Sequence, residues 1–167
     1  MNILGVDPGI ERTGVCIVSK TDCLKLVYHA LIKTDSSLEH CDRLKIIYDS
    51  LNLIISNYKI DQSSVEKLFF AKNVKTAMSV SEARGVILLC LRNNSIPIFE
   101  YTPLQVKQAL IGYGRATKSQ IQDIVKRLLG MNDKIKPDDV ADSVAIAITH
   151  LNSIKYFNKI QDAKREK

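Results

Sequence analysis

Hydrophobic and polar residues in the first third of the chain follow the short runs and alternation that are typical of β-strands. We expect strands at residues 3–7, 14–19 and 24–32, because each apolar run is bounded by turn-forming residues. The connections between these runs are short, which favours an antiparallel meander.

The rest of the chain mixes helical and strand patterns. The first expected helix has Leu44, Ile47, Tyr48 and Leu51 on one face and a cap at Asp35, Ser36 or Ser37. The elements expected after it are, in order, a strand near 63–68, a helix over 74–92, a strand over 95–101, helices over 102–110 and 117–130, and a last helix from Pro137. Thr102 and Thr117 are placed to cap two of these helices, and Gly130 to end one.

This order predicts an α/β fold: a five-stranded mixed sheet flanked by helices on both faces, in a single domain over residues 1–155. Residues 156–167 are polar, and we expect a frayed tail there. The helix over 74–92 carries small residues such as Ala77 and Gly85, which suit close packing on the chain's own sheet or on a second copy of the chain.

Composition adds a partner class and a location. The net charge of +6 over 167 residues favours an anionic partner such as nucleic acid, or reflects good solubility alone. The four cysteines form no C-x-x-C pair, which argues against zinc, and we expect Cys16 and Cys90 to be buried thiols. No apolar run reaches the roughly 18 residues of a membrane span, so we expect a cytoplasmic protein without a membrane partner.

Two acids end expected strands. Asp7 is followed at once by a Pro-Gly turn; sites form at the carboxyl ends of strands in α/β sheets, although an aspartate there also caps turns. In a straight strand, Glu66 would point to the same face as Leu68 and Phe70, so its charge would lie among apolar side chains. The alternative is that the strand ends at Glu66 and its carboxylate is solvated.

Three further acids open the last helix. The favourable position of acids at a helix N-terminus accounts for Asp138 and Asp139. It accounts poorly for Asp142, which lies a turn deeper and borders the apolar stripe of the helix. Asp139 and Asp142 are three residues apart and share one face, and two carboxylates directed together repel each other unless a cation lies between them.

Acids from three separate elements are consistent with a divalent metal site. Mg²⁺ prefers oxygen ligands, usually carboxylates together with phosphate and water. Two such ions, roughly 4 Å apart, can align the attacking water and the leaving oxygen of a phosphodiester. The spacing is therefore compatible with metal-dependent phosphodiester cleavage.

Five segments, taken together, resemble the RuvC family of Holliday junction resolvases: "GVDPGIERTG", "VEKLFFAKN", "SEARGVI", "TPLQVKQALIGYGRATKSQI" and "DDVADSVAIAITH". The resemblance runs in register from Met1 to about Leu151. It implies a ribonuclease-H-like fold, a homodimer, and Mg²⁺-dependent cleavage of four-way junction DNA by paired nicks in opposing strands, leaving a 5′-phosphate and a 3′-hydroxyl. It also implies coupling to the RuvA–RuvB branch-migration complex in recombination and repair.

The resemblance assigns the catalytic, metal-binding acids to Asp7, Glu66, Asp139 and Asp142. Some relatives carry His at the position of Asp139, whereas this chain has a carboxylate at all four positions. Two Mg²⁺ ions are implied, with Mn²⁺ able to substitute, and Asp7 would bridge them. Lys118 is placed to neutralise charge that develops on the phosphate.

Two stretches, residues 67–75 and 105–118, combine basic residues with aromatics or glycines, as DNA-binding surfaces do. The resemblance implies that Phe69 wedges into the junction centre and that Lys107 and Lys118 contact DNA. Lys75 and Arg115 are further candidates by location. A Phe pair in a strand more often packs in the core, which we expect of Phe70, and Lys107 also suits a solvated helix face.

Three other functions explain part of the pattern. Actin-like ATPases share the "GVDPG" strand and turn, but they need two such domains, and this chain has room for one. Another ribonuclease-H-like nuclease, acting on an RNA–DNA hybrid or a transposon end, would share the acids; the "LFFAKN" and "GYGRATK" loops favour junctions instead. A junction-binding protein without activity would lack some of the four acids, and all are present.

Overall fold

A five-stranded sheet forms the centre of the molecule in the computed structural model, which describes residues 1–67 and 74–165. The strands are β1 (Asn2–Asp7), β2 (Arg12–Lys20), β3 (Leu24–Lys33), β4 (Gln62–Glu66) and β5 (Ile98–Tyr101). Their order across the sheet is β3-β2-β1-β4-β5. The first three strands pair antiparallel, whereas β4 is parallel to both β1 and β5, so the sheet is mixed.

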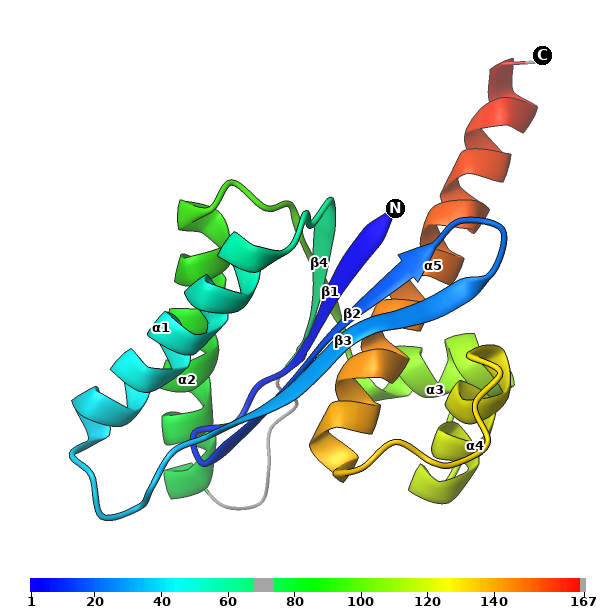
Figure 1. The fold of residues 1–167 in the computed structure, drawn as a ribbon. Coiled ribbons are helices and arrows are strands. Elements are labelled where there is room, and N and C mark those ends of the chain that lie inside the picture. Colours follow the sequence, from blue (N-terminus) through cyan, green and yellow to red (C-terminus); the bar gives the residue numbers. More distant parts are fainter. Residues whose placement is uncertain (68–73, 166–167) are drawn as a thin grey trace.

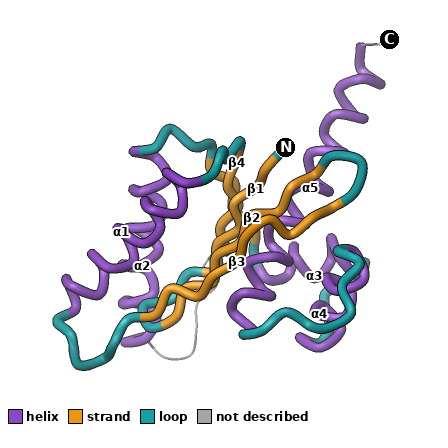
Figure 2. Tube along the Cα trace, in the orientation of Figure 1, coloured by secondary structure: helices purple, strands orange, loops and turns teal. Residues whose placement is uncertain are grey.

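Helices cover both faces of this sheet (Figures 1 and 2). Helices α1 (His40–Asn57) and α2 (Val74–Asn93) lie on one face, and α3 (Pro103–Ile111), α4 (Lys118–Leu128) and α5 (Asp138–Arg165) lie on the other. The expected fold class, a five-stranded mixed sheet between two layers of helices, is confirmed. Within the described residues, no helix combines the length and apolar character that a membrane span requires.

The central strands are apolar on both sides because each side faces a separate core. In β1, Ile3 packs in the core that includes Val144 and Ile148 of α5. Its neighbour Leu4 packs in the other core, with residues of α1 and α2 such as Ile47. Successive side chains of a strand point to opposite faces of the sheet, so a strand with helices packed on both faces has a continuous run of apolar residues in its sequence. The expected burial of Cys16 and Cys90 is also confirmed.

Two helices begin where the sequence predicts. Thr102 and Thr117 cap α3 and α4, and each accepts a hydrogen bond from the backbone N–H three residues on, at Gln105 and Gln120. The side-chain oxygens of the two glutamines accept hydrogen bonds from the backbone N–H groups of Thr102 and Thr117, which completes a capping box in each case. These local signals fix where α3 and α4 start, beside the carboxyl ends of β1 and β4.

The start of α1 differs from the sequence-based expectation. Helix α1 begins after Glu39, which makes no side-chain capping hydrogen bond. Asp35 instead accepts a hydrogen bond from the Ser37 backbone N–H at 2.8 Å, so the polar side chain that the sequence offered as a cap stabilises a local turn. Helix α5 runs to Arg165 and extends beyond the sheet (Figure 1), and the expected fraying of residues 156–167 stays a prediction.

Candidate active site

Asp7 and Glu66 lie together at one edge of the sheet. They end the parallel strands β1 and β4. Asp7 follows Val6 and Glu66 follows Val65, and these two valines are partners in the register of the two strands. The two carboxyls are close enough to interact, and this contact with Glu66 favours the protonated form of Asp7 and so raises its pKa. The strand does end at Glu66, as one interpretation of the sequence held, but the carboxylate is half-buried and faces another acid.

Two glycines allow helix α5 to approach this edge closely. A Cβ atom at Gly14 of β2 would lie 1.9 Å from the Asp139 carbonyl oxygen, and a Cβ atom at Gly5 of β1 would lie 2.2 Å from the Ser143 carbonyl oxygen. Both distances are far inside van der Waals contact, so a side chain at either position would push the helix away. The first turns of α5, with Asp139 and Asp142, are therefore pressed against β1 and β2.

Burial and mutual repulsion make it hard for these carboxyls to ionise together. Burial, followed by the charges of Glu66, Asp142 and Asp139, raises the pKa of Asp7 from 3.8 to about 8. Burial and the charge of Asp142 also raise the pKa of Glu66. Burial raises the pKa of Asp142 as well, against the opposing effect of a nearby lysine. The structure thus brings four acids from β1, β4 and α5 into one interacting group.

Two cations pair with the acids of α5. The Arg12 Nε and Nη2 atoms both lie 2.9 Å from Asp139 Oδ2. The Lys118 Nζ atom lies 2.8 Å from Asp142 Oδ2 and 3.5 Å from Asp138 Oδ2. Burial opposes the charge of Lys118, but its aspartate partners outweigh burial and raise the pKa of the ammonium. Each cation offsets part of the negative charge that surrounds Asp7.

This donor set has the chemistry of a site for a hard divalent cation. Carboxylate oxygens are the ligands that Mg²⁺ prefers. Burial first, and then the charges of the three neighbouring acids, raise the pKa of Asp7, and a bound cation would offset both effects. In the arrangement with both ion pairs formed, no group of three His, Cys, Asp or Glu side chains within the described ranges is placed to hold a metal ion. A cation shared by these carboxylates would therefore compete with Arg12 and Lys118 for Asp139 and Asp142.

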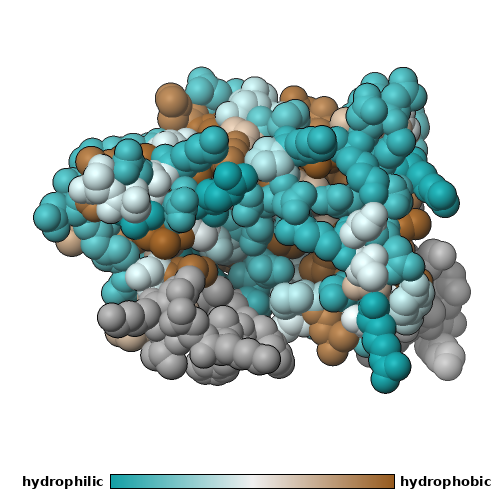
Figure 3. Space-filling model, turned by 90° about the horizontal axis from the view of Figure 1, so that it is seen from below, coloured by the Kyte–Doolittle hydropathy of each residue, from teal (hydrophilic) through white to brown (hydrophobic). Residues whose placement is uncertain are grey.

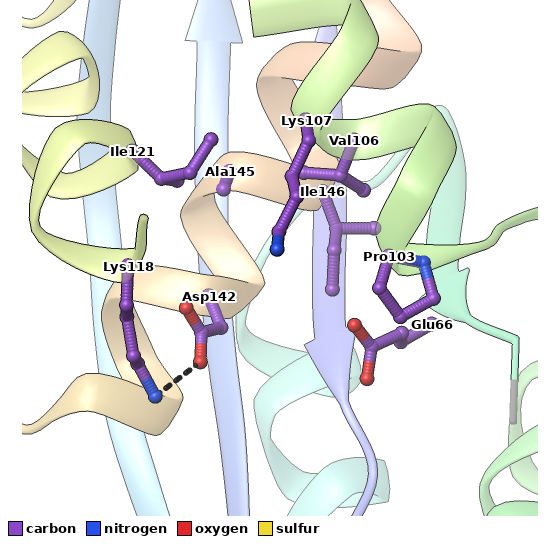
Figure 4. A pocket seen from close by; sticks show the side chains of 9 residues that line it. All are labelled: Glu66, Pro103, Val106, Lys107, Lys118, Ile121, Asp142, Ala145 and Ile146. Carbon is purple, nitrogen blue, oxygen red and sulfur yellow. Dashed lines mark ion pairs between the residues drawn. The ribbon is translucent and has the colours of Figure 1, made fainter. Parts of the chain in front are cut away.

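A pocket of about 220 Å³ opens between Glu66 and Asp142 and the helices α3 and α4 (Figure 4). Lys107 and Lys118 line it from these helices, and the Lys107 side chain extends toward the space between the two acids. Apolar residues such as Val106 complete its wall. The pocket therefore combines carboxylates for a cation with two ammonium groups for an anion.

The predicted DNA-binding residues have different outcomes. Lys107 and Lys118 lie beside the acids, while Arg115 is exposed in the segment between α3 and α4. Phe69 and the Lys75 side chain lie outside the described residues. Figure 3 views the face toward which β1 and β4 end, and hydrophilic residues predominate on it.

Two arginines of the site were not predicted from the sequence. Arg12 pairs with Asp139 across 127 residues of chain. Arg84 of α2 donates from Nε to the Glu66 backbone oxygen at 3.3 Å and forms an ion pair with Glu100, which holds the end of β4. A basic residue in the turn after Asp7 was the available signal for Arg12; nothing local marks Arg84.

Comparisons with known proteins identify similar chains along nearly the whole length. The family model described as "Crossover junction endodeoxyribonuclease RuvC" matches residues 3–150. The crossover junction endodeoxyribonuclease RuvC of Halothermothrix orenii is 53% identical over 95% of this chain and 97% of its own. That of Caldicellulosiruptor saccharolyticus is 50% identical over 92% of this chain and 93% of its own.

Solved structures agree with the sequence comparisons. The structure described as T. thermophilus RuvC in complex with Holliday junction substrate has a TM-score of 0.89 and 29% sequence identity. The match covers 93% of this chain and 96% of that one. This likeness confirms the ribonuclease-H-like fold.

Proposed function

The chain belongs to the RuvC family of crossover junction endodeoxyribonucleases, and we propose that it resolves four-way DNA junctions by paired symmetric nicks in opposing strands. The solved T. thermophilus relative, whose title names a Holliday junction substrate, supports this choice of substrate. The observation that carries the proposal is the carboxylate cluster at the strand ends, in which the pKa of Asp7 is raised to about 8. Concentrated carboxylates in a pocket with lysines suit metal-dependent phosphodiester cleavage.

Asp7, Glu66, Asp139 and Asp142 would hold two Mg²⁺ ions, with Mn²⁺ able to substitute. When bound, the ions supply Lewis acidity to the scissile phosphate and make water a stronger nucleophile. Asp7 interacts with each of the other three acids, so its carboxylate would contribute to holding both ions.

The lysines act on the substrate's charge. Lys118 pairs with Asp142, and its ammonium would be available to the phosphate if that carboxylate held a metal ion instead. Lys107 lines the same pocket and adds a second positive charge. Fixed cations aimed at developing negative charge lower the energy of the transition state. The products would be a 5′-phosphate and a 3′-hydroxyl.

A homodimer would place two such sites on a substrate of matching symmetry. Met78 and Leu89 of α2 are exposed, at 61% and 56%, and Gly85 lies between them on the same helix face. A second copy of the chain would cover this apolar surface. The coupling to RuvA–RuvB that the family resemblance implies remains part of the proposal.

The proposal predicts metal-dependent nicking of a synthetic four-way junction. With each strand labelled in turn, Mg²⁺ should convert the junction into nicked duplexes cut at symmetric positions, and EDTA should leave it intact. Linear duplex and an RNA–DNA hybrid should stay uncut. Preferential cleavage of the hybrid would identify a different ribonuclease-H-like nuclease, and binding without cleavage would identify a non-catalytic protein.

We further predict that Phe69→Ala slows junction cleavage about tenfold or more without lowering the melting temperature. The reason is that stacking of an aromatic ring on an unpaired base is worth about 1–3 kcal/mol. Phe70→Ala is the matched control, and it should destabilise the fold because Phe70 is expected in the core. A lower melting temperature for Phe69→Ala, with normal cleavage by the folded fraction, would contradict the wedge.

A further inference from the structure

A second hollow, of about 870 Å³, lies on the other side of the α5 acids, between the ends of β2 and β3 and the start of α5. Its charged lining consists of Arg12, Lys33, Lys118, Lys136, Asp138 and Asp139. Four cations thus face two acids, and we call this hollow the basic groove. None of the three cations other than Lys118 was a DNA-binding candidate from the sequence.

Arg12 and Lys33 are held close together by the sheet. They are directly opposite each other in the register of the antiparallel strands β2 and β3. Side chains at such positions lie on the same face, and like charges there destabilise the sheet. A repulsive pair at this place is explained if the groove accommodates an anion.

The two acids of the groove already have partners, so positive charge is in excess there. Asp139 pairs with Arg12, and Asp138 pairs with Lys118 and accepts a hydrogen bond from Gln122. Neither the Lys33 nor the Lys136 side chain forms an ion pair or hydrogen bond within the part of the chain that the structure describes. The acids of the groove are therefore already engaged, and two ammonium groups are left for a ligand.

The basic groove is continuous with the candidate active site. Lys118 lines both hollows, and Asp139 belongs to the carboxylate cluster and also to the groove wall. Arg12 would be a third cation available to a ligand if Asp139 held a metal ion in place of this ion pair. Lysines line both hollows: Lys107 and Lys118 line the pocket, and Lys118 and Lys136 line the basic groove.

We propose that the basic groove binds backbone phosphates of the DNA strand next to the phosphate that is cut. Arg12, Lys33 and Lys136 are the contacting residues, and the ligand is the phosphodiester backbone, without contacts to bases. This inference rests on the proposed function, since it takes the carboxylate cluster as the cutting site. It assigns the groove the role of holding the strand in line with those acids.

The test compares Lys33→Ala/Lys136→Ala with Lys25→Ala/Lys59→Ala, which removes the same charge. Lys25 is exposed at the other end of β3, and Lys59 is exposed before β4. Junction affinity is measured in EDTA over a series of salt concentrations. Each lost phosphate contact should lower the slope of log K against log salt by about 0.9, so the groove variant should lose about 1.8 and bind about tenfold more weakly at low salt.

Each outcome of this comparison either supports or contradicts phosphate binding in the basic groove. The control variant should bind within about twofold of the wild type, and equal slopes and affinities for the two variants would overturn the groove. The groove variant should melt no lower than the wild type, because it relieves repulsion; a lower melting temperature with unchanged binding would show that the lysines are structural. If the wild type neither binds nor cuts junctions, the proposed function fails. If the wild type does both but the groove variant binds like the control variant, the proposed function stands and the inference about the groove fails.

Discussion

Asp7→Asn is expected to lower the rate of junction cleavage by at least about a hundredfold to a thousandfold while junction binding is retained. The substitution keeps the shape of the side chain but removes the carboxylate that would hold the metal ions and that interacts with all three other acids. Single-turnover cleavage with Mg²⁺, beside a mobility-shift assay in EDTA, separates the two effects. Cleavage at the wild-type rate would remove Asp7 from the catalytic group.

The same substitution is expected to stabilise the metal-free protein. The pKa of Asp7 is about 8 in the folded chain against 3.8 ordinarily, so the folded state holds this proton more tightly than the unfolded state does. Its contribution is therefore most favourable below about pH 4 and is lost as the pH rises toward about 8. A shift of one pKa unit corresponds to about 1.4 kcal/mol, which makes the expected effect a few kcal/mol.

Thermal or urea unfolding in EDTA between pH 4 and pH 8 measures this effect. The wild type should lose stability relative to Asp7→Asn as the pH rises. Asp22→Asn is the control, because Asp22 is exposed in the turn between β2 and β3 and far along the sheet from the acids. Parallel stability curves for the wild type and Asp7→Asn would contradict the described crowding of carboxylates.

Gly14→Ala is expected to lower the free energy of unfolding by about 2–3 kcal/mol and to reduce cleavage sharply. The added Cβ atom would lie 1.9 Å from the Asp139 carbonyl oxygen, so β2 and α5 must move apart. That movement displaces Asp139 and Asp142 from the strand-end acids, and small misplacements of catalytic groups are costly.

Gly85→Ala is the matched control for the added methyl group. The described part of the chain leaves open space around Gly85 in α2. Alanine is the better helix former there, so the variant should be more stable by up to about 1 kcal/mol. Denaturant unfolding of both variants gives the comparison. A Gly14→Ala protein as stable and active as the wild type would show that α5 does not depend on this close approach.

Much of the architecture was predictable because its signals are local. The runs around Ile3 and Cys16 predicted buried strands, and Thr102 and Thr117 predicted two helix starts that the capping boxes confirm. The cap of α1 was not predictable, because Asp35 has the chemistry of a cap but uses it in its own turn. Local propensity alone does not decide between these uses.

The sequence was sufficient to predict which acids form the candidate site, but not how their side chains are arranged or paired. Spacing places Asp139 and Asp142 on one helix face, but it does not give their cation partners, which come from β2 and α4. The role of Gly14 is likewise visible only when α5 lies against it. The basic groove depends on the register of two strands, which brings Lys33 opposite Arg12.

The central claim is that the four carboxylates form a metal site. Anomalous diffraction from crystals soaked in Mn²⁺ tests it most directly, because it locates the ions independently of activity. We expect Mn²⁺ bound by Asp7 together with Glu66, Asp139 and Asp142, with Asp139 turned away from Arg12. Mn²⁺ bound elsewhere, or at this edge of the sheet without Asp7 as a ligand, would contradict the account.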